Sequence, residues 1–138
     1  MGESSRTKRL DPPTAAIRRV KPMKNSSLPT VVRDHVAAVN AFDVEAIMAT
    51  FADDAFVYDN RREFWGREAI RAWIAKEIVG DRVTMNVTEI VAHDDLTIVR
   101  ARYDGNYDKT NLPAELILTN YFKMRDDKII TLIIVRVA

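Results

Sequence analysis

Three polar side chains interrupt apolar stretches of the sequence, and each is of a type that can bind or react with a ligand. Asp59 ends the segment FVYD, His35 lies among valines and alanines in VVRDHVAAV, and Asn120 is the centre of LTNYF. A single buried polar group usually marks a structural hydrogen bond, because leaving it unpaired costs about 1–3 kcal/mol. Several that converge on an otherwise apolar, concave surface fit a ligand pocket better. Together the three residues therefore predict a small-molecule pocket.

Each of these residues also has a plain structural explanation. Asp59 could be a strand-end carboxylate that faces water or pairs with Arg61 or Arg136. His35 could be a core histidine whose hydrogen bonds are satisfied. The position of the three side chains within the fold has to decide between these explanations.

The elements that must position these residues are helices first and strands afterwards. Apolar residues recur every three to four positions in three segments, residues 28–42, 43–51 and 67–79. Residues 52–54 terminate the second segment. This spacing predicts three amphipathic helices. Runs rich in β-branched and aromatic residues predict strands, at residues 55–60, 61–65, 82–92, 96–107, 114–124 and 128–137. The order predicts an α+β domain over residues 28–138, with three helices packed on one face of a curved antiparallel sheet around a pocket.

Side chains alternate between the two faces of a strand, so their parity sorts the sheet into an inner and an outer face. Asn120 and Asp59 fall on the inner face in this assignment. The pocket walls that we predict are Val57, Trp73, Val99, Tyr103, Leu118, Phe122, Leu132, Ile134 and Arg136. The outer face of the last two strands is apolar as well, and a sheet with two apolar faces needs a second partner. We therefore expect a homodimer through Ile117, Tyr121, Ile133 and Val135.

Composition narrows the function classes. The net charge is +1, but the charges are distributed unevenly along the chain, because residues 1–27 carry seven basic and two acidic side chains. We interpret this segment as a disordered basic leader. The acidic remainder argues against nucleic acid as a partner. No apolar run approaches the roughly 18 residues of a membrane span. The sequence contains no cysteine and only two histidines, far apart, so we expect no metal, no cofactor and a cytoplasmic location.

The segment VVRDHVAAVNAFDVEAIMATFADDAFVYDN, residues 31–60, resembles the opening helices and first strand of bacterial ketosteroid isomerase. It also resembles the wider SnoaL-like group of the nuclear-transport-factor-2-like superfamily. The segments GREAIRAWI (66–74) and NYFKMRDDKIITLIIV (120–135) resemble the third helix and the end of the same fold. The resemblance covers residues 28–138 and implies a cone-shaped, cystatin-like fold with an internal pocket.

The resemblance also implies roles for the three polar residues. The general base of the isomerase falls on Asp59, its oxyanion-hole tyrosine on His35, and its protonated oxyanion-hole aspartic acid on Asn120. A carboxylate could then take a proton from the carbon next to a carbonyl group, while His35 and Asn120 donate hydrogen bonds to the developing oxyanion.

The sequence therefore predicts an isomerase- or cyclase-type proton-transfer enzyme that acts on an apolar cyclic substrate. The alternative is a non-catalytic ligand-binding or dimerisation module of the same fold. A less favoured alternative is epoxide hydrolysis, because Arg102-Tyr103-Asp104 has the Arg-x-Asp spacing of the epoxide hydrolases in this superfamily.

Overall fold

The computed structural model describes residues 28–136, so the predicted basic leader lies outside the described residues. The described chain forms three short α-helices, one π-helix and six strands. In chain order these are α1 (Thr30–Asn40), α2 (Val44–Met48), β2 (Phe51–Asp59), β3 (Arg62–Trp65), α3 (Gly66–Trp73), the π-helix η3 (Ile74–Val79), β4 (Thr84–His93), β5 (Leu96–Asp104), β6 (Leu116–Arg125) and β7 (Lys128–Arg136). The predicted α+β class and the helices-first order are confirmed.

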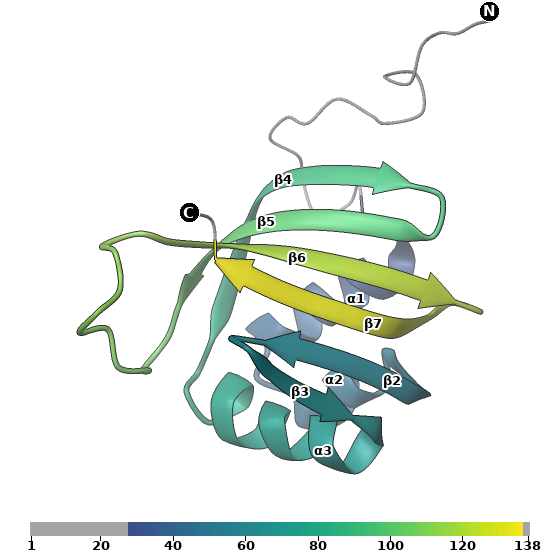
Figure 1. Ribbon diagram of the computed structural model, residues 1–138, viewed down its shortest axis with the longest axis horizontal. Helices are drawn as coiled ribbons and strands as arrows, with labels where there is room; N and C mark the ends of the chain where they lie inside the picture. The colour runs from purple at the N-terminus through teal and green to yellow at the C-terminus, as the bar shows by residue number, and fades with distance from the viewer. Residues whose placement is uncertain (1–27, 137–138) are drawn as a thin grey trace, which may run out of the picture.

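The six strands form one sheet in the order β3-β2-β7-β6-β5-β4, with α1 and α2 behind it and α3 below β3 (Figure 1). Strands β4 to β7 are the predicted antiparallel meander. The pairing between β2 and β7 is parallel, so the sheet is mixed where we expected antiparallel pairing throughout. This pairing joins the β2–β3 hairpin to the meander, and it places the strand that carries Asp59 beside the last strand.

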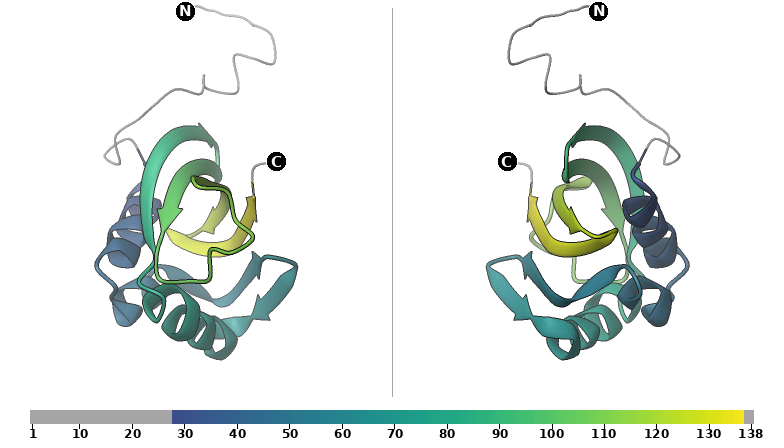
Figure 2. Two further views of the ribbon diagram at one scale, coloured as in Figure 1. Left: turned by 90° about the vertical axis from the view of Figure 1, so that its left-hand side faces the viewer. Right: turned by 90° about the vertical axis from the view of Figure 1, so that its right-hand side faces the viewer.

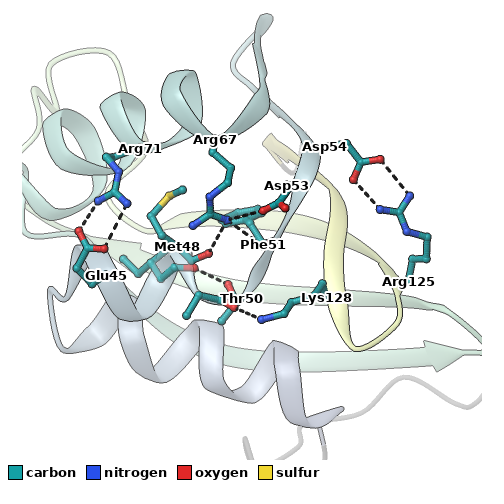
Figure 3. A network of polar contacts seen from close by, with 12 residues as sticks. Glu45, Met48, Thr50, Phe51, Asp53, Asp54, Arg67, Arg71, Arg125 and Lys128 are labelled. Atoms are coloured by element: carbon teal, nitrogen blue, oxygen red, sulfur yellow. Dashed lines mark hydrogen bonds and ion pairs between the residues drawn. The ribbon is translucent and has the colours of Figure 1, made fainter.

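The boundary between α2 and β2 differs from the prediction. Asp43 caps α2, since its side chain accepts a hydrogen bond from the Ala46 N–H at 3.0 Å. The helix ends at Met48, however, and the strand already begins at Phe51. Tertiary hydrogen bonds explain the early start: Arg67 of α3 donates to the carbonyl oxygens of Met48 and Phe51 at 3.4 and 3.2 Å (Figure 3). The Ile129 N–H of β7 also donates to the Thr50 carbonyl at 2.8 Å.

Ion pairs connect α2 and β2 to the neighbouring elements α3 and β6. Arg71 of α3 binds Glu45 of α2, and Arg125 of β6 binds Asp54 of β2 through two hydrogen bonds of 2.6 and 3.1 Å (Figure 3). Asp54 is therefore a surface residue of a strand, which corrects our expectation that it ends a helix.

The third predicted helix is regular only in its first half. It is α-helical to Trp73 and continues as a π-helix from Ile74 to Val79. A π-helix is rare, and such segments frequently occur at functional sites. The helix ends at Val79 as predicted, and Gly80 is its C-cap, where a Cβ atom would clash with the Lys76 carbonyl oxygen. The π-helical turn directs Ile74 and Ile78 toward the interior of the domain.

The core lies between the helices and the inner face of the sheet, whose strands curve strongly (Figure 2). On the outer face, apolar residues form a row across five neighbouring strands. The paired positions run Tyr58, Ile133, Tyr121, Ile98 and Val91. All five side chains are only partly buried, and Figure 1 shows no helix in front of this face. No helix of residues 28–136 has the length and apolar character needed to cross a membrane.

Candidate active site

A small cavity lies between the helices and the inner face of the sheet. Its volume of about 20 Å³ is room for roughly one water molecule. Most of its walls are apolar, and the polar side chains among them come from α1, β5 and β6. The lining residues are His35, Val39, Ile47, Trp73, Ile74, Ile78, Val83, Met85, Tyr103, Asn120, Leu132 and Ile134. Two of the three predicted polar residues, His35 and Asn120, therefore face one cavity.

Asp59 lies beside this cavity, at the end of the same cross-strand row as Asn120. The register pairs Asp59 with Ile134 and Ile134 with Asn120. Side chains at paired positions point to the same face of a sheet, and neighbouring strands lie about 4.8 Å apart. The Cα atoms of Asp59 and Asn120 are thus roughly 10 Å apart, with Ile134 of the cavity wall between them. Three residues from distant parts of the sequence form one row on the inner face.

The Asp59 carboxylate is held by two partners. The Trp73 indole N–H donates to Oδ2 at 3.1 Å, and the Arg62 guanidinium lies 3.8 Å from the same oxygen. Trp73 is itself a wall of the cavity. Burial raises the pKa of Asp59 above its ordinary value, and the Trp73 hydrogen bond and the Arg62 charge only partly offset this effect. A carboxylate with a raised pKa is a stronger base than one in water. The arginine beside Asp59 is therefore Arg62, rather than Arg61 or Arg136 as we considered from the sequence.

Asn120 is fully buried, and both the oxygen and the nitrogen of its side-chain amide form hydrogen bonds. The Tyr103 hydroxyl donates to Asn120 Oδ1 at 2.7 Å, and Asn120 Nδ2 donates to the Val99 carbonyl at 3.3 Å. An amide nitrogen carries two hydrogens, so one N–H of Asn120 remains for a ligand. Burial raises the pKa of Tyr103 strongly, and the negative charge of Asp59 raises it further. The Tyr103 hydroxyl therefore stays protonated and fixes the orientation of the amide.

His35 is buried on α1, and a hydrogen bond anchors one edge of its ring. Its Nδ1 lies 3.1 Å from Thr50 Oγ1. The ring packs edge-on against Phe51 and Phe122, with centroids 5.5 and 5.3 Å away. Burial lowers the pKa of His35 to about 4, so the imidazole is neutral at physiological pH.

The predicted walls fall into two groups. Four of the nine, Trp73, Tyr103, Leu132 and Ile134, line the cavity. Val57, Val99 and Phe122 are buried in the surrounding core, and Leu118 is half-buried. Arg136 is exposed, because its pair with Leu118 lies two residues beyond the Asn120–Ile134 pair, near the end of β7. Arg136 therefore does not reach the cavity rim, and its prediction as a pocket wall is wrong.

Sequence reasoning missed six further walls, which come from the helices and from the chain at and just before the start of β4. These are Val39, Ile47, Ile74, Ile78, Val83 and Met85. It also missed the polar partners Thr50 and Tyr103, although Tyr103 was expected as an apolar wall. The signal for Tyr103 was present, because it shares its face of β5 with Val99, which pairs with Asn120.

The residues of the epoxide-hydrolase alternative lie away from this cavity. Arg102 pairs with Glu115 at 3.1 Å and Asp104 pairs with Lys109 at 2.8 Å, and all four side chains are largely exposed. Within residues 28–136, no group of three or more His, Asp or Glu side chains is placed to hold a metal ion.

Comparisons with known proteins agree with the fold. Residues 32–132 match the SnoaL-like domain family. The chain belongs to this family. The SnoaL-like domain has the nuclear-transport-factor-2-like, ketosteroid isomerase-like fold that the sequence resemblance implied.

Several solved structures share this SnoaL-like architecture. A proposed polyketide cyclase from Sinorhizobium meliloti is 26% identical, with a TM-score of 0.74 over 82% of this chain and 100% of that chain. A protein with a ketosteroid isomerase-like fold from Catenulispora acidiphila, solved with trimethylamine, is 21% identical, with a TM-score of 0.68 over 79% and 86%. TerC, co-crystallised with polyporic acid, is 15% identical, with a TM-score of 0.65 over 78% and 89%. A search of curated proteins gives no match.

Proposed function

We propose that this SnoaL-like domain binds a small cyclic carbonyl compound in the cavity and moves a proton on the carbon next to the carbonyl group. Asp59 is the base and Asn120 donates to the carbonyl oxygen. The observation that carries this proposal is the row Asp59–Ile134–Asn120 on the inner face, in which burial raises the pKa of the carboxylate. The similarity to a proposed polyketide cyclase and to ketosteroid isomerase-like proteins supports the same chemistry.

The reaction needs a base and a hydrogen-bond donor on opposite sides of the reacting carbonyl group. Asp59 removes a proton from the carbon, and the electrons move onto the oxygen. The free N–H of Asn120 stabilises the negative charge that develops there. Return of the proton to a different carbon gives an isomerisation, and attack of the enolate carbon on a second carbonyl of the same molecule gives a cyclisation.

A ring-sized ligand needs more room than this cavity of about 20 Å³ offers, so one wall has to move. We infer that this wall is η3, which carries Ile74 and Ile78. Its outer side is fastened by Glu77, which accepts two hydrogen bonds from Arg62 at 2.7 and 2.6 Å. The pair is partly exposed, and such pairs contribute only about 0–1 kcal/mol. Breaking the Arg62–Glu77 pair to open this wall therefore costs little free energy.

The proposal is tested with para-nitrophenol, a planar mimic of an enolate whose anion absorbs visible light. We expect the protein to bind the anion, and Asp59→Asn to bind it on the order of tenfold more tightly. Removal of one of two negative charges roughly 10 Å apart has this effect at an effective dielectric constant near 20. A spectrophotometric titration of both proteins measures it.

Asp54→Asn is the matched control, because Asp54 lies on the same strand but is exposed and bound to Arg125. It should leave the affinity unchanged. If neither the wild type nor Asp59→Asn binds the anion, the proton-transfer proposal fails, and the alternative of a binding or dimerisation module is favoured.

We also propose that two copies associate through the outer face of the sheet. The row from Tyr58 to Val91 leaves apolar surface accessible. Trp65 extends it at one edge: it is 66% exposed, and its ring packs against that of Phe56 with centroids 4.1 Å apart. Large contiguous apolar patches on a protein surface mark interaction sites. Of the predicted contacts, Tyr121 and Ile133 lie within this row, and Ile117 and Val135 flank it.

Ile133→Glu should convert the dimer to a monomer, because it places a charge at the centre of the row. Sedimentation velocity over a range of concentrations measures the change. Ala72→Glu, on the exposed side of α3, should remain dimeric. A wild-type protein that sediments as a monomer at every concentration contradicts the dimer.

A further inference from the structure

We propose that His35 presents an unprotonated Nε2 to the cavity, and that the ligand of this site carries an O–H or N–H group that donates to it. This inference rests on the proposed function only in that the same cavity is the ligand site. It assigns His35 a role as hydrogen-bond acceptor, whereas the family resemblance implies a donor at this position.

A count of protons around Thr50 fixes the tautomer of His35. The Thr50 hydroxyl lies 2.6 Å from the carbonyl oxygen of Ile47, and a carbonyl oxygen can only accept, so the single hydroxyl hydrogen points to Ile47. Thr50 Oγ1 must then accept from His35 Nδ1, which lies 3.1 Å away. A neutral imidazole has one N–H and one lone-pair nitrogen. With the hydrogen on Nδ1, the lone pair is on Nε2.

The surroundings keep the ring neutral and in place. Phe51 and Phe122 pack against it edge-on, and burial holds the pKa of His35 far below its ordinary value. Among residues 28–136, no hydrogen bond reaches Nε2, while His35 is one of the cavity walls. Because no donor of these residues reaches this lone pair, a ligand in the cavity that carries an O–H or N–H group can donate to it.

The cavity then offers opposite hydrogen-bonding groups from two elements. Asn120 of β6 has an N–H to give, and His35 of α1 has a lone pair. Phe122, which touches His35, is two residues from Asn120 on the same face of β6. A substrate that satisfies both has a carbonyl oxygen and a hydroxyl group. The geometry therefore favours hydroxylated or enolised cyclic carbonyl compounds over simple ketones.

The tautomer is measured directly by imidazole ¹⁵N NMR of the whole protein near neutral pH. The sequence has only two histidines, and half-exposed His93, beside Asp94, serves as the internal reference. We expect the Nδ1 of His35 to carry the hydrogen and Nε2 to resonate as an unprotonated nitrogen. A hydrogen on Nε2 overturns the inference. Thr50→Val, which removes the acceptor, should shift the ring toward a mixture of tautomers.

The ligand is tested by adding phenol or toluene, which differ in the donor group but little in shape. Phenol should shift the Nε2 resonance of His35 toward the value of a hydrogen-bonded nitrogen, and toluene should not. Equal shifts from both compounds, or no binding of phenol up to its solubility, overturn the ligand part. The tautomer needs no turnover, so its failure is distinct from failure of the reaction assigned to Asp59.

Discussion

Replacement of Asp59 by asparagine should slow proton transfer by about 10²- to 10⁴-fold, the usual contribution of a positioned general base. The reason is that asparagine keeps the shape and the hydrogen bond from Trp73 but has no basic oxygen. Exchange of α-hydrogens with deuterium in a panel of hydroxylated cyclic ketones measures the rate by NMR. The assay detects proton removal even when the final product is unknown.

Two controls sharpen the Asp59 experiment. Asp54→Asn should exchange at the wild-type rate, since that carboxylate lies on the surface and binds Arg125. Asp59→Glu keeps the basic group but displaces it, so its exchange rate should fall between those of the wild type and Asp59→Asn. Wild-type exchange no faster than buffer across the panel would favour the non-catalytic module. Equal exchange by wild type and Asp59→Asn would assign the base to another residue.

The second large effect concerns stability at acid pH. The pKa of His35 is about 4 in the folded protein, against about 6.5 in an unfolded chain. Between these two values the unfolded state binds more protons, so the free energy of unfolding falls as the pH falls from about 6.5 to 4. The full difference of roughly 2.5 pKa units corresponds to about 3 kcal/mol. Below pH 4 this residue causes no further loss.

His35→Phe should lack this part of the pH dependence. Phenylalanine fills a similar volume, and Thr50 keeps its hydrogen bond to Ile47. Burial acts on Asp59 with the opposite sign, because a raised pKa favours folding as the carboxyl takes up a proton. That contribution is common to both proteins and cancels in the difference. Urea unfolding of both proteins at several pH values measures this difference, with His93→Gln, at a half-exposed position, as the control. Parallel curves for wild type and His35→Phe would refute the expectation.

The sequence was sufficient for the class of fold and for the faces of the strands. Helical spacing found α1, and strand parity placed Asp59 and Asn120 on the inner face, because both patterns are local. The parallel pairing of Asp59 with Ile134 was not predictable in this way, since it joins segments whose local patterns carry no information about each other.

Side-chain partners and the size of the cavity were also beyond local reasoning. Thr50 follows α2 and gave no sign that it would meet His35, fifteen residues earlier. The π-helical turn after Trp73 looks like ordinary amphipathic helix in sequence, and it changes which residues face the cavity. The volume left between Ile74, Ile78 and the sheet depends on packing rather than on residue types.

The parallel pairing of β2 with β7 has a consequence for the order of folding. The β2–β3 hairpin reaches the rest of the sheet only through β7, and the contacting residues Asp59 and Ile134 are 75 positions apart in the chain. Contacts of such long range raise the contact order and slow folding. The meander from β4 to β7 forms from neighbouring segments, whereas β2 has to wait for β7. The carboxylate and the amide therefore come together late, at a step that closes a loop of 75 residues.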